Sequence, residues 1–483
     1  MTPTKARVTA RSWRGLALRI CAAAAVMVLI AVGGPLPTAT AVPPPHVDPA
    51  VDIAPPDGDP GPALPMKQNT NCATSVVMAD SQFGSIPASS VFNVSELHKY
   101  ARGDGQIVAV IDSGVQPVSR LPRLRGGGDY LMRGDGLSDC DHHGTLVAGI
   151  IAAQPSATDA FVGVAPGAEI LSIRQTSAAF TLDNPPQGYT ENDKSAANML
   201  SLAESIVHAA NLGATVINLS VTACLDAGSP VDLHALAGAL DYAVRVKDVV
   251  IVTAAGNLTE RCQPNPGFDP ANPGDKRNWD GVRSISLPSY YWDHVLSVGG
   301  SELQGDPYAN SMPGPWVGVA APAMNIVSLD PTEPTPGALT NGSIVKGVPT
   351  PINGTSFASA YVAGLAALIR EKYSTTGDPR DRLSAHQVIN RILQTAHTPA
   401  DGLNNVFGYG LVDPVAALTA NVPKGDIVAP GIPSVRVDVP APAPPRDRLG
   451  EEWVIGFGIA AIAVVAVLAL ALFAFGGNKG GSA

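Results

Sequence analysis

Val108-Ala-Val-Ile-Asp112-Ser-Gly114 predicts a buried β-strand that ends in a carboxylate and a glycine turn. An acidic side chain at the tip of a buried strand costs free energy unless another group pairs with it. On this motif alone, an aspartate that caps the following turn is an alternative. Asp112 therefore indicates a functional site only if other reactive side chains lie beside it in the fold.

Further apolar runs of strand length follow along the chain and alternate with helical patterns. Residues 197–212 and 231–246 have apolar side chains at helical spacing, and Ser384-x-x-Gln387 is a capping box for a later helix. This alternation predicts an α/β fold, with a doubly wound, mainly parallel sheet and helices on both faces. Such sheets place functional groups at the carboxyl ends of their strands. The strands expected besides 107–112 are 170–174, 216–221, 249–255, 295–299 and 317–321.

A histidine opens a predicted helix in Asp141-His142-His143-Gly144-Thr145. Either histidine has the chemistry of a base, but Gly144 gives His143 room beside the sheet, whereas we expect His142 to face the loop. A single histidine is more often structural than catalytic. This motif, like the first, depends on its neighbours in the fold.

Asn353-Gly-Thr-Ser356-Phe-Ala358 begins a strongly apolar predicted helix that runs to about Lys372. Serine is a favoured N-cap residue, which is the simplest explanation of its place. A capping serine does not, however, require the Gly-Thr approach and the buried helix behind it. With Asp112 and His143, Ser356 completes the residue types of a hydroxyl nucleophile, an imidazole base and a carboxylate that orients the base.

These three motifs, in this order and at this spacing, resemble the signatures of the subtilisin-like serine proteases. The resemblance extends to Gly163-Val-Ala-Pro-Gly167 and Ala254-Ala-Gly-Asn257, so it covers about residues 106–418. It implies a subtilisin-like doubly wound sheet and a serine endopeptidase that needs no cofactor.

The resemblance also implies a role for each residue. Ser356 attacks the scissile carbonyl, His143 transfers the proton and Asp112 orients His143. Asn257 donates a hydrogen bond to the oxyanion, and the Ser356 backbone N–H at the positive end of its helix supplies a second donor.

Asn218-Leu-Ser220-Val-Thr222 resembles the strand that lines the main specificity pocket, so Ser220, Val221 and Thr222 are expected to bind substrate. Many family members have glycine where Val221 or Thr222 stands, which leaves the preferred P1 residue open. Residues 176–195 are expected to form an inserted loop near the non-primed side of the substrate. These departures argue against a broad digestive enzyme.

The two ends of the chain predict that the protein is exported and anchored in a membrane. Basic residues up to Arg19, an apolar run at 20–32 and Ala39-Thr-Ala41 are typical of a cleaved signal peptide, with an uncleaved anchor helix as the alternative. The uncharged stretch Trp453 to Phe475 is long enough to cross a bilayer, and a buried globular helix is the alternative. Positive-inside bias at Lys479 then predicts a single-pass type I protein of the cell membrane with its catalytic domain on the extracytoplasmic side. The expected organisation is a signal peptide at 1–41, an N-terminal extension at 42–90, a protease domain at 91–422, a Pro-rich linker at 423–452, a transmembrane helix at 453–475 and a short cytoplasmic tail at 476–483.

The composition excludes several other classes of protein. A formal net charge of −10, with no basic stripe beyond the first residues, argues against a nucleic-acid partner. Of five cysteines, Cys21 lies in the signal peptide, so the exported chain keeps four, which suggests two disulfides with three possible pairings. No Cys-x-x-Cys spacing predicts a zinc site, and no acidic cluster predicts a calcium loop.

More narrowly, the chain resembles the mycosins, subtilisin-like proteases associated with mycobacterial type VII secretion. That resemblance implies an N-terminal extension that wraps the catalytic domain, disulfides Cys72–Cys140 and Cys224–Cys262, and two kinds of partner: an exported protein substrate and the secretion membrane complex. A structural component that stabilises the complex, with proteolysis secondary, is the alternative function. The features that carry the resemblance are the two ends of the chain, Met66-Lys-Gln-Asn-x-x-Cys72, Leu137-Ser-Asp-Cys140-Asp-x-His-Gly and Tyr409-Gly-x-Val-Asp-Pro-Val-Ala-Ala-Leu418.

Overall fold

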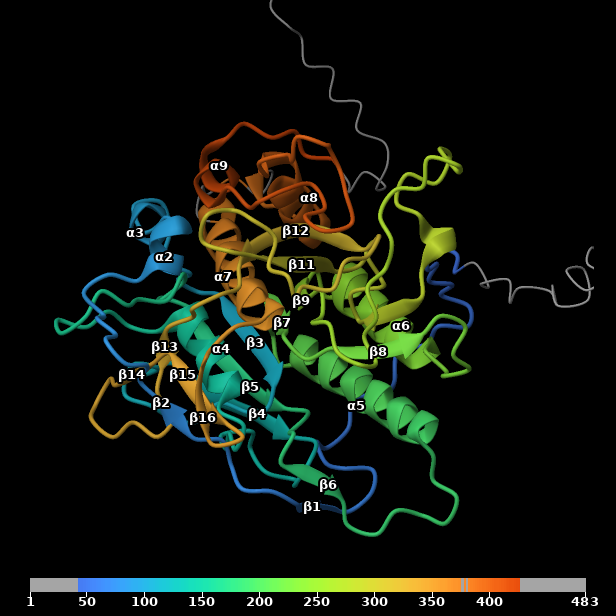
Figure 1. Ribbon diagram of the computed structural model, residues 1–483, viewed down its shortest axis with the longest axis horizontal. Coiled ribbons are helices and arrows are strands. Elements are labelled where there is room, and N and C mark those ends of the chain that lie inside the picture. Colours follow the sequence, from blue (N-terminus) through green and yellow to red (C-terminus); the bar gives the residue numbers. More distant parts are fainter. Residues whose placement is uncertain (1–41, 375–377, 379–380, 426–483) are drawn as a thin grey trace, which may run out of the picture. The chain divides into compact units, whose positions relative to one another are not determined.

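A sheet of seven parallel strands forms the centre of the computed structural model, which describes residues 42–374, 378 and 381–425 (Figure 1). The strand order is β12-β11-β9-β7-β3-β5-β4. Every residue of β7 and β9 is buried, so both faces of the sheet are covered at its centre, as parallel sheets require. The predicted α/β fold with a large parallel sheet is confirmed. The strands are β3 Ile107–Asp112, β4 Leu124–Asp129, β5 Glu169–Arg174, β7 Val216–Leu219, β9 Val250–Ala254, β11 Leu296–Ser301 and β12 Val317–Pro322.

Two groups of helices pack against this sheet. α4 (His143–Ala152) contacts α7 (Thr355–Ser374), while α5 (Glu191–Asn211) contacts α6 (His234–Asp241). α7 touches β7, β9, β11 and β12, and its side chains are buried over its first sixteen residues. The helix therefore runs through the core. The remaining helices are α2 Pro87–Val91, α3 Val94–Leu97, α8 Ala385–Thr395 and α9 Pro414–Thr419, with a π-helical turn at Tyr242–Val246 and a 3-10 turn at Trp279–Gly281.

Small residues make the close packing of α7 possible. A Cβ added at Gly364 would lie 2.6 Å from the Cβ of Val164, too close for two carbon atoms. Any larger residue at this position would push α7 away from the segment that follows α4. The position of the amino end of α7 thus depends on glycine at its middle.

Several sequence predictions need correction in their boundaries. The strand predicted at 216–221 ends at Leu219, because both the carbonyl and the hydroxyl of Ser220 turn to Ser356 instead of a neighbouring strand. The helix predicted at 197–212 begins at Glu191, where Thr190 and Asp193 form a capping box. The expected loop at 176–195 therefore contains the first turn of α5, as well as a short strand. The helix predicted at 231–246 begins at His234 and changes to π-helical geometry at Tyr242.

Strand β4 was not predicted. Its glycines 126–128 indicate a turn, yet they form the edge strand beside β5. A Cβ added at Gly127 would lie 2.6 Å from a methyl carbon of Leu171 on β5. Glycine here serves a close approach between chain segments.

The segment 42–90 lies along the rest of the described chain and pairs with it at several places. Asp52 Oδ1 lies 2.6 Å from His234 Nδ1, and Asp57 Oδ1 lies 2.7 Å from His208 Nδ1. Further on, β1 pairs with β6 and β2 pairs with β15, and the Cys72–Cys140 disulfide joins the segment to the chain just before α4. The small sheets contain β1 Met66–Gln68 with β6 Phe180–Leu182; β2 Ser75–Val76, β15 Gly342–Val345 and β16 Val348–Pro351; β8 Ala223–Asp226 with β10 Ser284–Leu287; and β13 Ser328–Leu329 with β14 Leu339–Thr340.

The signal peptide expected at 1–41, the transmembrane helix at 453–475, the tail at 476–483 and all but three residues of the linker at 423–452 lie outside the described residues. Within the described ranges, none of the helices combines the length and the apolar character that a membrane crossing needs.

Candidate active site

The end of β3 and the start of α4 bring an acid and an imidazole together. Asp112 is the last residue of β3 and is fully buried, and His143 is the first residue of α4. His143 Nδ1 lies 2.7 Å from Asp112 Oδ1. About 30 % of the His143 side chain is exposed, so its other face is open to a substrate. This pair has the geometry of a base held in one orientation by a carboxylate.

His142 points elsewhere, as the sequence suggested. It has a left-handed backbone with φ of 65° at the N-cap of α4, and its Nδ1 lies 2.8 Å from the Ser75 hydroxyl of the N-terminal segment. Only His143 faces Asp112.

Glycines allow the close approach of α4 to the turn after β3. A Cβ added at Gly144 would lie 2.0 Å from the carbonyl oxygen of Gly114. Gly114 itself has φ of 97°, which disfavours other residues. The Asp112–His143 distance therefore depends on both glycines.

Ser356 lies in the first turn of α7 and is almost completely buried. Its hydroxyl donates to the carbonyl of Ser220 at 3.0 Å. The ring of Phe357, the next residue, lies 5.3 Å from the His143 ring between centroids. The residue after the nucleophile candidate thus packs against the imidazole, while within the described residues no hydrogen bond joins His143 and Ser356. Such bonds often form only when substrate binds.

The Asn257 side chain lies against the same turn of α7. Its Oδ1 accepts hydrogen bonds from the Thr355 N–H at 3.1 Å and the Thr355 hydroxyl at 3.3 Å. These two bonds fix which way the amide is turned. The Nδ2 group then lies beside Gly354, 3.8 Å from where a Cβ would be. Asn257 therefore presents an N–H donor beside the nucleophile candidate.

The three residues predicted to bind substrate follow β7. The Ser220 hydroxyl donates to the Ser356 carbonyl at 2.9 Å and receives a hydrogen bond from Asn218 Nδ2 at 2.7 Å. Val221 and Thr222 are partly exposed. The structure therefore brings this segment directly beside Ser356.

Both disulfides implied by the resemblance are present, and each joins a segment near these residues. Cys140 precedes His143 by three residues and is bonded to Cys72. Cys262 follows Asn257 by five residues and is bonded to Cys224 of β8.

One buried carboxylate near His143 was not singled out from the sequence. Asp139 accepts hydrogen bonds from Ser113 Oγ at 2.8 Å and from the N–H and hydroxyl of Thr145 at 2.8 and 2.6 Å. Burial raises the pKa of the Asp139 carboxyl to about 7, although its hydrogen bonds to Thr145 and Ser113 oppose the shift. The only sequence signal was an acidic residue four positions before His143.

Charge around His143 favours its protonated form. Burial lowers the pKa of His143, but the charge and hydrogen bond of Asp112 and the charges of Asp139 and Asp141 raise it, and the net direction is upward from 6.5. In the described ranges, no group of three or more histidine, cysteine, aspartate or glutamate side chains is arranged to hold a metal ion.

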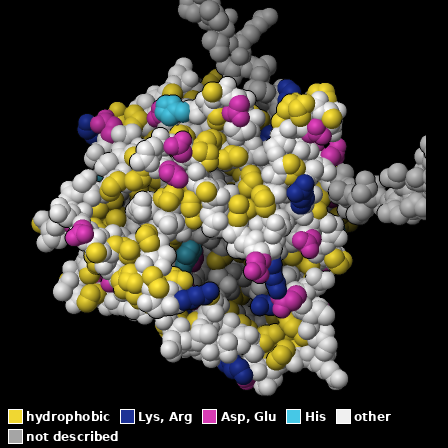
Figure 2. Space-filling model, in the orientation of Figure 1, with side chains coloured by type: hydrophobic (Ala, Val, Ile, Leu, Met, Phe, Trp, Pro, Cys, Tyr) yellow, Lys and Arg dark blue, Asp and Glu magenta, His cyan; other side chains and the backbone are white. Residues whose placement is uncertain are grey.

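Hydrophobic side chains are unevenly distributed over the surface around the site. In Figure 2, hydrophobic side chains gather over the region of β13 to β16, and a hollow opens between this patch and the side that carries α5. Val345 and Val348, on the hairpin that precedes Ser356, are 49 % and 60 % exposed. The exposed tip of this hairpin thus carries two apolar side chains with Lys346 between them.

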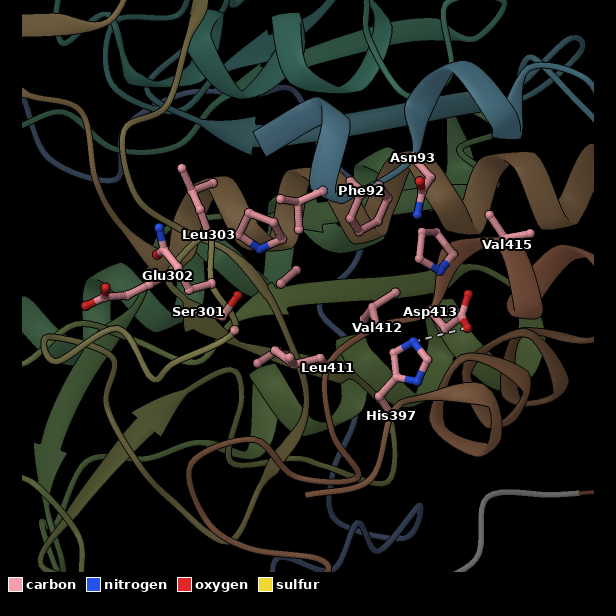
Figure 3. A pocket seen from close by; sticks show the side chains of 17 residues that line it. Phe92, Asn93, Ser301, Glu302, Leu303, His397, Leu411, Val412, Asp413 and Val415 are labelled. Atoms are coloured by element: carbon pink, nitrogen blue, oxygen red, sulfur yellow. Dashed lines mark ion pairs between the residues drawn. The ribbon is translucent and has the colours of Figure 1, made fainter. Parts of the chain in front are cut away.

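A second concavity of about 450 Å³ lies away from these residues (Figure 3). Phe92 and Asn93 form one side of it, and Val412 and the ion pair between His397 and Asp413 form another, with 3.2 Å between Nε2 and Oδ2. Neither the Asp112–His143 pair nor Ser356 lines it. It is separate from the candidate active site.

Comparison with known proteins agrees with this geometry. Residues 103–410 match the model of the subtilase family. Mycosin-2 of Mycobacterium tuberculosis is 40 % identical over 94 % of this chain and 97 % of its own length. The crystal structure of MycP1 from Mycobacterium smegmatis, 44 % identical, superposes with a TM-score of 0.75 over 80 % of this chain and 97 % of that chain. A chain in the structure of an intact ESX-5 inner membrane complex, 42 % identical, superposes with a TM-score of 0.75 over 90 % of this chain and 100 % of that chain.

Proposed function

This chain belongs to the subtilase family of serine proteases, among the mycosins, and we propose that it cleaves a few exported proteins beside a type VII secretion complex at the outer face of a membrane. The observation that carries the proposal is the Asp112–His143 contact of 2.7 Å beside the first turn of α7, which contains Ser356. No other group of titratable residues is needed for the reaction.

In the proposed reaction the Ser356 hydroxyl rotates from the Ser220 carbonyl to His143 and attacks the scissile carbonyl carbon. His143 Nε2 takes the hydroxyl proton, while Asp112 holds the Nδ1 side of the ring and stabilises the imidazolium. His143 then gives the proton to the leaving amine. Water repeats the sequence and hydrolyses the acyl-enzyme.

The oxyanion is assigned to Asn257 Nδ2 and the backbone N–H of Ser356. Asn257 is suited to this because Thr355 occupies its Oδ1 and leaves the amide N–H₂ turned toward Gly354. The amino end of α7 adds a favourable dipole. Ser220, Val221 and Thr222 form one wall of the substrate cleft.

A secretion role is supported by the relatives. The ESX-5 inner membrane complex contains a chain that matches 90 % of this one, and a periplasmic assembly from the same complex contains another match at 44 % identity. We propose that this chain associates with such a complex, anchored by residues 453–475 with its catalytic domain on the periplasmic side. Its substrate is then a protein exported through that complex.

The second candidate function is structural stabilisation of the complex, with proteolysis secondary. The match to all of a chain inside the structure of an intact inner membrane complex favours it. The two functions are separable, because one needs Ser356 and the other needs the surface and the anchor.

Labelling of the full-length chain by a fluorophosphonate probe tests the proteolytic function. The wild-type chain should be labelled, and Ser356→Ala and His143→Ala should not. A folded, oxidised wild-type chain without label would leave only the structural role. Secretion that continues in a Ser356→Ala strain but stops when residues 453–475 are deleted would establish both roles separately.

A further inference from the structure

Asp139 ties together the two segments that carry Asp112 and His143. Its Oδ1 accepts from Ser113, the residue after Asp112, and its Oδ2 accepts twice from Thr145, in the first turn of α4. The carboxylate is buried. Any movement of α4 away from the end of β3 would break at least one of these three hydrogen bonds.

Asp139 and Asp112 share one hydroxyl group. Ser113 Oγ lies 2.8 Å from Asp139 Oδ1 and 3.2 Å from Asp112 Oδ1, and it accepts a hydrogen bond from the Gly144 N–H at 3.0 Å. A hydroxyl has one proton, so it donates to one carboxylate at a time. The shorter distance favours Asp139. Asp112 Oδ1 then accepts a hydrogen bond from the Ser113 N–H at 2.7 Å and contacts His143 Nδ1. The buried Oδ2 of Asp112 has no hydrogen-bond partner among the described residues.

The charge of Asp139 also acts on His143. The charged groups that face His143 are Asp112 from β3 and Asp139 and Asp141 from the loop before α4. The neighbouring His142 instead contacts Ser75. An ionised Asp139 therefore adds negative charge behind the imidazole, in surroundings where screening by water is weak.

We propose that Asp139 is a positioning residue of the proteolytic site: it fixes the end of β3 against α4, and its negative charge makes His143 a stronger base. This inference rests on the proposed protease function. Burial raises the pKa of the Asp139 carboxyl to about 7, so Asp139 contributes its full charge only above that pH, where its hydrogen bonds from Thr145 and Ser113 favour the ionised form.

Asp139→Asn separates charge from shape. The amide oxygen can accept both Thr145 hydrogen bonds, and its N–H₂ can donate to Ser113 Oγ, which then turns its own proton to Asp112. The shape is kept and the charge is lost, while the Ser113 proton moves from residue 139 to Asp112 and the amide brings a second N–H into the buried site. The matched control is Asp141→Asn, which removes a neighbouring charge whose hydrogen-bond partner in the described part of the chain is the backbone N–H of Ala178, at 3.0 Å.

The measurement is the pH dependence of kinact and KI for a fluorophosphonate probe reacting with the full-length chain. In Asp139→Asn the midpoint of the acid limb should fall by about half a pH unit relative to wild type. The plateau value of kinact should fall a few-fold, with KI unchanged. Asp141→Asn should show the smaller shift of the two, because the charge of Asp141 raises the pKa of His143 less than the charge of Asp139 does.

A folded Asp139→Asn chain whose midpoint lies within about 0.1 pH unit of wild type would overturn the proposal and leave Asp139 a structural residue. If that variant does not fold, Ser113→Ala decides, because it keeps the Asp139 side chain and removes the hydroxyl that joins Asp139 to Asp112 and to the Gly144 N–H. It should lower kinact without lowering the midpoint, and an unchanged kinact would overturn the positioning role. Failure of the protease function itself is distinguishable, because wild type would then show no Ser356-dependent labelling at any pH.

Discussion

The two halves of the active site differ in how far they are assembled. On the acid–base side, Asp112, His143 and Asp139 already form a hydrogen-bonded, mostly buried group. On the nucleophile side, the Ser356 hydroxyl is turned to Ser220 and must rotate to reach His143. The base is thus oriented before substrate binds, whereas the Ser356 hydroxyl is held in a different hydrogen bond.

The largest effect on activity is expected when one side of the active site loses its reactive group. Ser356→Ala removes the nucleophile and should lower kcat for peptide cleavage by about 10⁶-fold. Asp112→Asn keeps the shape of the acid–base side but not the charge, and should lower kcat by about 10⁴-fold. Both are measured on a fluorogenic peptide, with unchanged melting temperature as the control. Substantial cleavage by folded Ser356→Ala would assign the nucleophile to another residue.

A smaller loss is expected from the oxyanion donor. Asn257→Ala should lower kcat by about 10²- to 10³-fold with little change in KM, because the hydrogen bond forms only as charge develops. Thr355→Val is the matched control: it removes one of the two donors to Asn257 Oδ1 and keeps the other, so a loss of only a few-fold is expected. Equal losses in the two variants would mean that Asn257 acts only by holding the helix turn.

The pH dependence of kcat/KM tests only the side of the active site that contains Asp112 and His143. His143 must be neutral to accept the proton, and the negative charges around it raise its pKa above 6.5. Activity should therefore be lost as pH falls, with a midpoint above 6.5 in kcat/KM. His142→Gln should leave this midpoint in place, since His142 faces Ser75. A midpoint below 6.5 would contradict the arrangement.

The smallest effect on catalysis is expected from the disulfides, one on each side of the site. Cys72→Ala with Cys140→Ala opens a loop of 68 residues, and Cys224→Ala with Cys262→Ala opens one of 38. Loop-closure entropy predicts a loss of about 4 kcal/mol in each case, seen as a drop of about 10 °C in melting temperature. At 25 °C the remaining folded enzyme should lose activity only a few-fold. An unchanged melting temperature would show that the crosslink does not restrain the unfolded chain.

Much of this architecture could be predicted from sequence because its signals are local. Asp112 ends an apolar run, His143 precedes Gly144 at the start of an apolar helix, and Ser356 follows Gly354 and Thr355 at the start of another, so each motif could be placed on its element. Strand β4 gave no strand signal in the sequence, because three of its residues are glycines and one of them, Gly127, approaches Leu171 too closely for a side chain. The start of α5 was missed because its cap, Thr190 with Asp193, precedes the apolar pattern.

The details of the site depend on contacts between distant segments and could not be predicted. The Ser356 hydroxyl turns to Ser220, which is 136 positions away in the chain. The role of Asp139 depends on the Ser113 hydroxyl, 26 positions earlier. Such pairs join different elements, so the spacing of residues within one helix or strand does not predict them.

The central claim is tested most directly by a crystal structure of the chain after reaction with a peptidyl phosphonate. We expect a covalent bond from Ser356 Oγ to phosphorus, His143 Nε2 within hydrogen-bond distance of that oxygen, and the phosphoryl oxygen at Asn257 Nδ2. An inhibitor bonded to another residue, or a Ser356 hydroxyl still donating to Ser220 in a fully inhibited enzyme, would contradict it.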